Sequence, residues 1–239
     1  LEAAEMVKLA NNTFRDLSFS FANELALLAD KYNVNAFELV NAANEGYPRN
    51  NIPSPSPGVG GYCLTKDPIL FSSTSNGPRN DAVLGFSSRR VNEKAAFYPV
   101  DLIKKYAERL QIPVSNLNVL IVGIAFKGIP ETTDIRGSVA IDVFNELKGN
   151  VKKVFGWDAI IESKGLQAIG FEIAENLQSA IGFVDVVLIM NNHPDNVSSD
   201  MYVSSQNRKL LFDGWNQLDK VEVEKIPGLT YATMGYMTP

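Results

Sequence analysis

Apolar residues recur at intervals of three and four over the first thirty residues of the chain. This spacing puts side chains on one stripe of an α-helix, and no Gly or Pro interrupts it, so the pattern predicts one long amphipathic helix. The stripe consists of Met6, Ala10, Phe14, Leu17, Phe21, Leu25 and Leu28. Residues 33–35 break the pattern, and Asn35 suits the N-cap of a short helix that runs through Ala43 and ends near Gly46.

The amino-acid composition changes after this helix. Residues 47–68 contain five prolines and three glycines, and the glycines all lie in the run Gly58-Val59-Gly60-Gly61. This composition predicts a loop rather than regular structure. A polar stretch at residues 72–80 precedes a second helical region, which we expect to bend at Pro99 and to end at about Leu110.

Strands and helices alternate after residue 113. Residues 118–124 (NVLIVGI) form a continuous apolar, β-branched run, which is typical of a strand buried on both faces. Residues 137–147 predict a helix, and four further segments predict strands: 151–157, 171–173, 184–190 and 210–213. This alternation predicts an α/β fold with a doubly wound parallel sheet that binds ligands at the carboxyl ends of its strands. We therefore expect a helical domain at residues 1–112 and a Rossmann-like α/β domain at residues 113–239.

Composition narrows the class of protein. Of 239 residues, 45% are hydrophobic and 21% are charged, and the net charge of −5 argues against nucleic acid or an anionic membrane as a partner. The single cysteine excludes an internal disulfide and suits a reducing compartment, which predicts a cytoplasmic protein. No apolar run predicts a membrane span or a signal peptide. The chain begins at Leu1 in what looks like helix interior, which suggests a fragment.

The loop at residues 56–68 is the first candidate for chemistry. Its glycines allow the backbone to approach a ligand, and Cys63 follows them directly. Lys66 would favour the reactive thiolate, and Asp67 is placed to orient a water or accept a proton. The alternative is a buried cysteine that acts as a small apolar residue.

Lys8 and Asn12 are the second candidate. Their separation of four residues puts them on one face of the first helix, where an ammonium and an amide can stabilise a developing oxyanion. A solvated helix face is the alternative.

The turn after the first predicted strand is the third candidate. Lys127 and Arg136 lie where such sheets bind nucleotides, and each is able to donate to a phosphate, although neither a dinucleotide fingerprint nor a phosphate-binding loop is present. One histidine without cysteine partners cannot hold a metal, so His193, the only histidine, is expected to be a structural residue or a loop residue near the sheet edge.

Together these segments resemble the UDP-glucose/GDP-mannose dehydrogenase family over essentially the whole chain. The stretches that carry the resemblance are residues 4–16 (AEMVKLANNTFRD), 21–24 (FANE), 58–68 (GVGGYCLTKDP), 123–128 (GIAFKG) and 134–138 (DIRGS). They match the family's central helical domain and its C-terminal nucleotide-sugar domain. The resemblance implies that the N-terminal NAD-binding domain, with its GxGxxG motif, is absent from these residues, so that this chain alone has little or no activity.

The resemblance also implies a reaction, the oxidation of the C6 alcohol of a nucleotide sugar to a uronate with two NAD, as in polysaccharide biosynthesis. Cys63 matches the nucleophile that forms a thiohemiacetal and then a thioester. Lys8 and Asn12 match the pair that stabilises the oxyanion, and Asp67 matches the carboxylate that assists water or the lysine.

Further residues match the family's binding positions. Gly60, Phe126 and Lys127 match contacts to the UDP-sugar substrate, and Arg49 resembles a cation supplied to the substrate of the partner subunit. Lys66 and Arg136 are the expected contacts to NAD. The long first helix matches the family's homodimer interface.

Two departures from the family refine the prediction. Trp215 stands where some members carry an Arg, and the spacing from Lys127 to Arg136 is longer than in the UDP-glucose branch. That spacing, with the run NTFRD, favours a UDP-N-acetylhexosamine such as UDP-N-acetylmannosamine as substrate. Two other functions remain open: a non-catalytic module for dimerisation and nucleotide-sugar binding, and a scaffold without a ligand.

Overall fold

The first part of the protein is built around one long helix. The computed structural model describes residues 2–74, 82–173, 176–197, 201 and 208–239. Helix α1 (Glu2–Ala29) has 28 residues, which confirms the long helix predicted over the first thirty, and η1 (Asp30–Tyr32) follows it. The side chain of Asn35 accepts hydrogen bonds from two backbone N–H groups of α2 (Ala36–Asn44), which confirms the predicted N-cap.

Three more helices follow. Helix α3 (Asp67–Ser73) begins inside the segment expected to be irregular, because Pro68 occupies a first-turn position where its missing N–H costs nothing. Helices α4 (Leu84–Ala96) and α5 (Tyr98–Leu110) are separated at Phe97, so the bend expected at Pro99 is a break between two helices, with Pro99 in the first turn of the second. Most of the polar stretch predicted at residues 72–80 lies outside the described residues.

A seven-stranded sheet forms the second part, in the order β3-β2-β1-β4-β5-β6-β7. All neighbouring pairs are parallel except β6 and β7, which are antiparallel. The strands are β1 (Asn118–Val122), β2 (Lys153–Trp157), β3 (Glu172–Ile173), β4 (Val186–Ile189), β5 (Lys209–Asp213), β6 (Leu229–Thr233) and β7 (Tyr236–Met237). The predicted α/β fold is therefore confirmed, with β6 and β7 as strands that the hydrophobic pattern did not predict.

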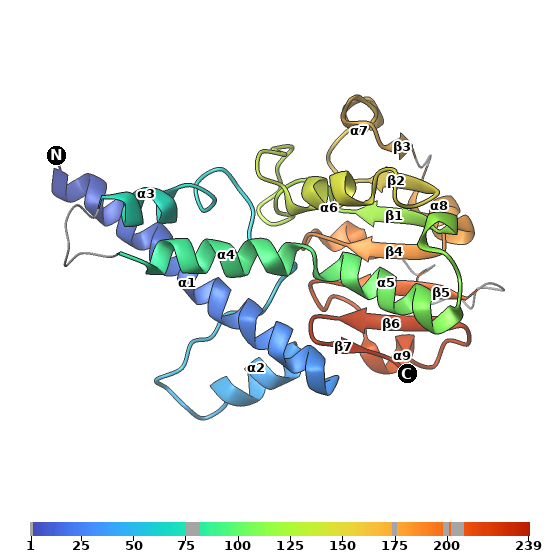
Figure 1. Ribbon diagram of the computed structural model, residues 1–239, viewed down its shortest axis with the longest axis horizontal. Helices are drawn as coiled ribbons and strands as arrows, with labels where there is room; N and C mark the ends of the chain where they lie inside the picture. Colours follow the sequence, from blue (N-terminus) through green and yellow to red (C-terminus); the bar gives the residue numbers. More distant parts are fainter. Residues whose placement is uncertain (1, 75–81, 174–175, 198–200, 202–207) are drawn as a thin grey trace.

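Helices cover both faces of the sheet, so the strands are buried on both sides. Ile121 and Leu188 belong to the core under α5 and α6 (Val139–Leu147), which lie in front of the strands in Figure 1. Leu120 and Val187 point to the opposite face, against α8 (Leu177–Phe183) and α9 (Lys220–Val223). Three shorter elements complete the chain: η2 (Val114–Asn116), α7 (Ser163–Ile169) and η3 (Pro194–Asn196).

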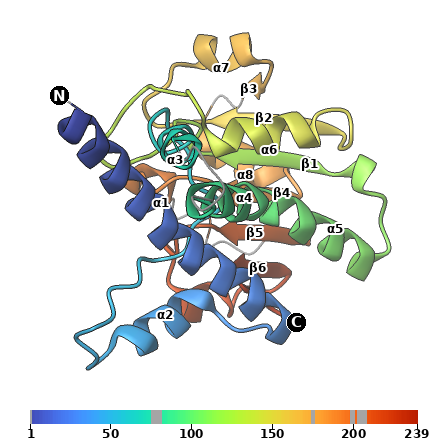
Figure 2. The same ribbon diagram turned by 60° about the vertical axis from the view of Figure 1, so that its left-hand side comes forward.

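Helix α5 precedes the proposed domain boundary but packs on the sheet. Its Leu102, Ile103 and Tyr106 are fully buried in the same core as the strands. The division at residues 112 and 113 stays a prediction, and the part of the chain that stands apart from the sheet in Figure 1 is formed by α1 to α4. Helix α4 packs against α1: it crosses α1 in Figure 1 and is seen nearly end-on beside α1 in Figure 2.

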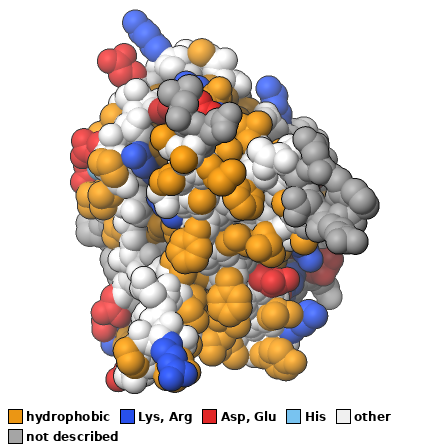
Figure 3. All heavy atoms as spheres, turned by 90° about the vertical axis from the view of Figure 1, so that its left-hand side faces the viewer, with side chains coloured by type: hydrophobic (Ala, Val, Ile, Leu, Met, Phe, Trp, Pro, Cys, Tyr) orange, Lys and Arg blue, Asp and Glu red, His pale blue; other side chains and the backbone are white. Residues whose placement is uncertain are grey.

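The predicted apolar stripe of α1 does not face the core. Met6, Phe14 and Phe21 are 64%, 71% and 56% exposed, whereas the opposite face of the helix buries small and polar side chains. Figure 3 shows hydrophobic side chains gathered on the face of the molecule that α1 to α4 form. Among the described residues, none of the helices has the length and hydropathy that a bilayer span requires.

The hairpin of β6 and β7 holds the far end of α1. Backbone N–H groups of Gly235 and Met237 donate to the Tyr98 hydroxyl, at 3.1 Å, and to the Asn33 side chain, at 2.9 Å. The N–H of Ala36 donates to the carbonyl of Met234 at 3.0 Å. The last residues of the chain are thereby fixed to the turn that connects α1 and α2.

Candidate active site

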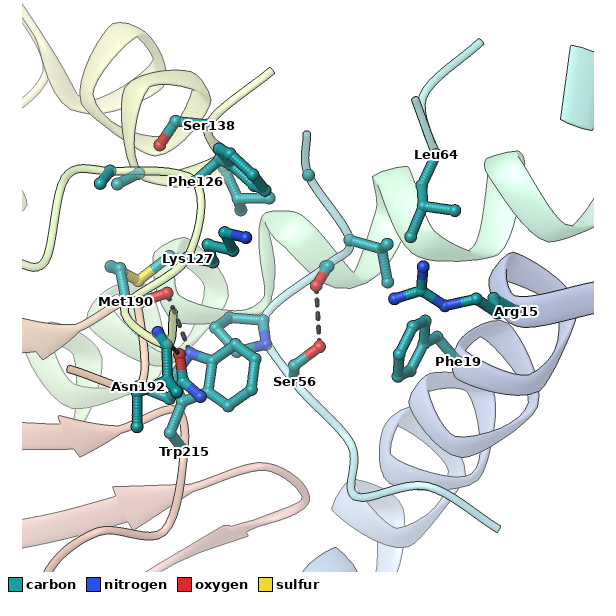
Figure 4. Close-up of a pocket in the computed structure, with 18 residues that line it drawn as sticks. Arg15, Phe19, Ser56, Leu64, Phe126, Lys127, Ser138, Met190, Asn192 and Trp215 are labelled. Carbon is teal, nitrogen blue, oxygen red and sulfur yellow. Dashed lines mark hydrogen bonds between the residues drawn. The ribbon is translucent and has the colours of Figure 1, made fainter. Parts of the chain in front are cut away.

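A cavity of about 220 Å³ lies where the loop at residues 56–64 crosses between α1 and the sheet. On the sheet side it is lined from the segments after β1, β4 and β5. The order of strands reverses between β1 and β4, and open α/β sheets bind ligands outside the carboxyl ends of strands at such a point. In Figure 4, Lys127, Asn192 and Trp215 come from the sheet side, and Arg15, Phe19 and Leu64 come from the opposite side.

The glycine loop is in direct backbone contact with the sheet domain. The N–H of Gly61 donates to the carbonyl of Gly137 at 3.1 Å. A Cβ at Gly60 would lie 2.3 Å from that same carbonyl oxygen, so a side chain at this position would separate the two segments. The predicted need for glycine here is explained by a close approach of two backbone segments, beside the cavity that Gly60 lines.

Behind the loop, α1 and α4 are joined by an ion pair. The carboxylate of Asp16 is fully buried and accepts hydrogen bonds from Arg89 Nη1 at 2.9 Å, Ser88 Oγ at 2.6 Å and Asn92 Nδ2 at 2.8 Å. Arg89 is 5% exposed. Buried charges are tolerated when they are paired and hydrogen-bonded in this way.

The same network holds the cavity loop. Arg89 Nη1 also donates to the carbonyl of Val59 at 3.1 Å. The side chain of Asn23 donates to Asn92 at 2.9 Å and accepts from the N–H of Ser56 at 2.8 Å. Both ends of residues 56–59 are therefore fixed by buried side chains, none of which we selected from the sequence. The signal available was the seven-residue spacing of Asp16 and Asn23, which puts two polar residues on the inner face of α1.

Asp67 joins the cysteine loop to α1. Its side chain is 1% exposed, its Oδ2 accepts from Asn12 Nδ2 at 2.6 Å, and its Oδ1 accepts from Lys66 Nζ at 3.0 Å. Lys8 Nζ lies 4.0 Å from Oδ2. Burial by itself would raise the pKa of Asp67, but the hydrogen bonds from Asn12 and Lys66 outweigh it and hold the pKa below its usual range. The structure thus brings together Lys8, Asn12, Lys66 and Asp67.

Cys63 is exposed in the turn that leads into α3. Its carbonyl accepts from the N–H groups of Asp67, at 2.9 Å, and Lys66, at 3.3 Å, so the turn fixes the cysteine backbone to Asp67. The alternative, a buried cysteine that acts as a small apolar residue, is therefore wrong.

Two cations flank the aromatic ring next to the cysteine. The ammonium of Lys66 lies 5.0 Å from the centre of the Tyr62 ring, and the guanidinium of Arg136 lies 5.1 Å from it. Arg136 is also paired with Asp134 through Nε–Oδ1 and Nη2–Oδ2 contacts of 3.0 and 2.8 Å. Hydrogen bonds from Arg136 lower the pKa of Asp134 to about 2.

The remaining predicted residues divide between the cavity and its surroundings. Gly60, Phe126 and Lys127 line the cavity. Leu64 and Arg15 also line the cavity. Cys63 directly precedes Leu64, and Asn12 lies about one helical turn before Arg15, so both are next to residues of the cavity wall. Arg15 was not among the selected residues, although it follows Asn12 by three positions and so shares its helix face.

Two predicted residues lie elsewhere. Arg49 is exposed in the turn after α2 and does not line the cavity. His193 is buried, its Nδ1 accepts from the N–H of Asp195 at 3.1 Å, and its Nε2 lies 3.2 Å from a Glu131 oxygen, which confirms a structural role. No group of three metal-binding side chains occurs among the described residues.

Comparison with known proteins agrees with this arrangement. Residues 2–94 match the central domain of the UDP-glucose/GDP-mannose dehydrogenase family, and residues 120–220 match that family's UDP binding domain. The UDP-N-acetyl-D-mannosamine dehydrogenase of Pyrococcus horikoshii is 34% identical over 215 residues, which are 89% of this chain and 48% of the relative. The NDP-N-acetyl-D-galactosaminuronic acid dehydrogenase of Ralstonia nicotianae is 34% identical over 80% of this chain and 43% of its own length. This chain therefore spans about half the length of these curated relatives.

Solved structures give the same result. The structure of the Pyrococcus horikoshii UDP-D-ManNAc dehydrogenase aligns with a TM-score of 0.81 at 31% identity, covering 98% of this chain and 52% of the other. A UDP-glucose dehydrogenase from Pyrobaculum islandicum aligns with a TM-score of 0.79 at 26% identity, covering 98% of this chain and 51% of the other.

Proposed function

The chain belongs to the UDP-glucose/GDP-mannose dehydrogenase family, and we propose that it is the cysteine-bearing and UDP-sugar-binding part of an NAD-dependent nucleotide-sugar 6-dehydrogenase. One alcohol RCH₂OH, two NAD⁺ and one water give one carboxylate RCOO⁻, two NADH and three H⁺. The observation that carries the proposal is the contact of Asp67 with Lys8 and Asn12, which joins the cysteine turn to α1 at the edge of the cavity.

Cys63 is the proposed nucleophile. Its thiolate adds to the carbonyl carbon of the C6 aldehyde, which forms a C–S bond and moves the carbonyl electron pair onto oxygen. The thiohemiacetal that results is oxidised to a thioester, and water then cleaves the C–S bond and returns the thiol. The exposed position of the thiol supports access by the substrate.

Lys8 and Asn12 are the proposed donors to the oxygen that gains charge, first in thiohemiacetal formation and again in hydrolysis. Asp67 holds Asn12 by a hydrogen bond of 2.6 Å and faces the ammonium of Lys8, so one buried carboxylate orients both donors. Because the pKa of Asp67 is lowered, the carboxylate is ionised at neutral pH and is able to orient the attacking water.

The nucleotide sugar is proposed to bind in the cavity, against Gly60, Phe126 and Lys127. The ammonium of Lys127 and backbone groups of the glycine loop suit a diphosphate. Because the net charge of the chain is −5, an anionic ligand must be bound by such local cations. We propose a UDP-N-acetylhexosamine as substrate, which the names of the similar enzymes support. Arg49, which does not line this cavity, is proposed to serve the substrate of a second subunit.

Lys66 and Arg136 are the residues proposed to contact NAD, which when bound supplies the acceptor for the two hydrides that leave C6. Both are cations at the surface beside Cys63 and Tyr62, which fits an anionic cofactor that approaches the thiol from outside. The carboxylate of Asp134 accepts two hydrogen bonds from the guanidinium of Arg136 and so orients it.

A homodimer through α1 is part of the proposal. The exposed stripe of Met6, Phe14, Phe21 and Leu28 is apolar over most of the helix length, and exposed apolar surface of this extent marks an interaction site. A cytoplasmic location, expected from the single cysteine, is proposed with it.

Steady-state kinetics of the natural full-length protein test the proposed oxidation of a nucleotide sugar. NADH formation is measured with UDP-N-acetylmannosamine and with UDP-glucose, for the wild type, for Cys63→Ser and for the control Gly182→Ala, where an added Cβ meets nothing within 4 Å. We expect two NADH per sugar, preference for the acetamido sugar, and no complete turnover in Cys63→Ser. Preference for UDP-glucose would overturn the substrate assignment.

The alternative is a module for dimerisation and nucleotide-sugar binding without catalysis. It predicts that UDP binds while oxidation is absent and Cys63→Ser changes nothing. If calorimetry detects no UDP binding to the chain, both the enzyme and the module are excluded, and a scaffold without a ligand remains.

A further inference from the structure

Trp215 forms part of the cavity wall but takes no part in the proposed chemistry. It is half-buried in the loop after β5 and lines the cavity with Lys127, Asn192 and Met190. Figure 4 shows its indole on the sheet side of the cavity, across from Arg15 and Phe19. Each wall thus offers one cation and one aromatic ring, Lys127 with Trp215 on the sheet side and Arg15 with Phe19 on the opposite side.

The loop that carries Trp215 is rigidly held. The fully buried carboxylate of Asp213 accepts from the N–H groups of Trp215, at 3.2 Å, and Leu218, at 2.8 Å. The N–H of Gly214 donates to the carbonyl of Ile189 at 3.2 Å, and a Cβ at Gly214 would meet that oxygen at 2.7 Å. The backbone before Trp215 is therefore fixed to the end of β4, and the backbone after it is fixed to Asp213 at the end of β5, before any ligand binds.

The indole also has its only hydrogen-bonding group occupied. Its Nε1–H donates to the carbonyl of Met190 at 3.0 Å, a contact drawn as a dashed line in Figure 4. Indole is a donor only, so the ring has no further polar contact to give. What Trp215 presents to a ligand is a flat apolar π surface of fixed orientation.

We propose that Trp215 is a specificity-determining residue that stacks its indole on the pyrimidine base of the nucleotide ligand. This inference rests on the proposed function, in which the cavity takes a nucleotide sugar. The diphosphate is then left to the cations of the cavity, Lys127 and Arg15, whose charge suits it and not an uncharged base. A preformed aromatic wall suits a planar ring because neither partner must reorganise on binding.

Fluorescence tests the stacking directly, because the chain has only two tryptophans. In the variant Trp157→Phe, Trp215 is the only fluorophore of its kind, and it is excited at the red edge of its band, where uracil does not absorb. We expect saturable quenching by UDP and none by inorganic pyrophosphate. Quenching that requires the hexose, with UDP-N-acetylglucosamine active and UDP inactive, means that Trp215 contacts the sugar and overturns the inference.

Affinity for UDP supplies a second test, by calorimetry on the chain. Stacking of one base on an aromatic side chain predicts a loss of about 10- to 100-fold in Trp215→Leu and near-complete retention in Trp215→Phe. Pyrophosphate should bind all three proteins equally. If the wild type binds UDP and Trp215→Leu binds it equally well, the stacking is wrong and the proposed function stands. If the wild type does not bind UDP, the proposed function itself fails. Should Trp215→Leu not fold, the quenching experiment and Trp215→Phe still decide.

Discussion

Replacement of Arg89 by methionine removes the cation that faces a fully buried carboxylate. Asp16 is 0% exposed and Arg89 is 5% exposed. Water therefore cannot take the place of either side chain unless the contact between α1 and α4 opens. Methionine keeps an unbranched apolar stem of similar length, so the substitution changes the charge more than the packing.

The expected cost is set by the carboxylate that remains. Loss of one partner of a buried ion pair typically destabilises a protein by about 3–5 kcal/mol. Ser88 and Asn92 still donate to Asp16, which favours the lower end, about 3 kcal/mol, and the carbonyl of Val59 loses its donor as well. Because Val59 lines the cavity, we also expect affinity for UDP to fall.

Urea unfolding followed by circular dichroism measures the effect, with Arg90→Met as the matched control. Arg90 is the exposed neighbour in the same helix, and its replacement should change the free energy of unfolding by less than about 0.5 kcal/mol. The double variant Asp16→Asn, Arg89→Met removes both charges, and the Ser88 hydroxyl can then accept from the new amide. It should be more stable than Arg89→Met alone.

Two outcomes refute this reasoning. One is an Arg89→Met protein within about 1 kcal/mol of the wild type, which means that the buried charge is solvated in some other way. The other is a double variant whose loss equals the sum of the two single losses, since two side chains that interact cannot be additive.

Three further substitutions have defined outcomes. Phe14→Asp should convert the proposed dimer to a monomer in light scattering, while Val221→Asp, at a site of similar exposure on α9, should leave the oligomer unchanged. Asp67→Asn should lower the free energy of unfolding at about pH 7, and this difference should shrink as the pH falls below the ordinary aspartate pKa of about 4. The sign follows because the folded pKa is depressed, so the stabilisation is present above the unfolded pKa and is lost as pH falls through the folded value. Gly60→Ala adds a Cβ 2.3 Å from a carbonyl oxygen and should weaken UDP binding, measured by calorimetry, whereas Gly182→Ala should not.

Periodicity predicted most of the fold, because long regular patterns reflect backbone geometry. The spacing in α1 predicted the helix but not which side is buried, since its inner face carries Asp16 and Asn23, whose burial depends on hydrogen bonds to residues about 70 positions away. Strand β6 (Leu229–Thr233) mixes threonines with apolar residues and was missed, and α3 was hidden by the Asp-Pro pair that begins it.

The candidate site was less accessible to pattern analysis. The four-residue spacing of Lys8 and Asn12 predicted a shared helix face, but their contact with Asp67, which follows Asn12 by 55 positions, depends on how α1 and α3 pack. Cys63, Lys66 and Asp67 were selected because they follow the glycines of the loop, whereas their specific catalytic roles came from the family resemblance and stay proposals. Trp215 was noticed only as a departure, because no spacing rule relates it to the loop that it faces.

The C-terminal hairpin is attached to the turn after α1, at the opposite end of that helix from Lys8. The attachment is made by the N–H of Met237, which donates to Asn33, and by the N–H of Ala36, which donates to Met234. Lys8 lies 21 positions before Ala29, or about 30 Å along a helix. At that length, a tilt of only ~2° moves the ammonium by about 1 Å, as much as separates a hydrogen bond from a lost contact. Between these two ends, the buried contacts of Asp16 and Asn23 with α4 hold the helix, so the alignment of the proposed oxyanion donors depends on these contacts together with the C-terminal hairpin.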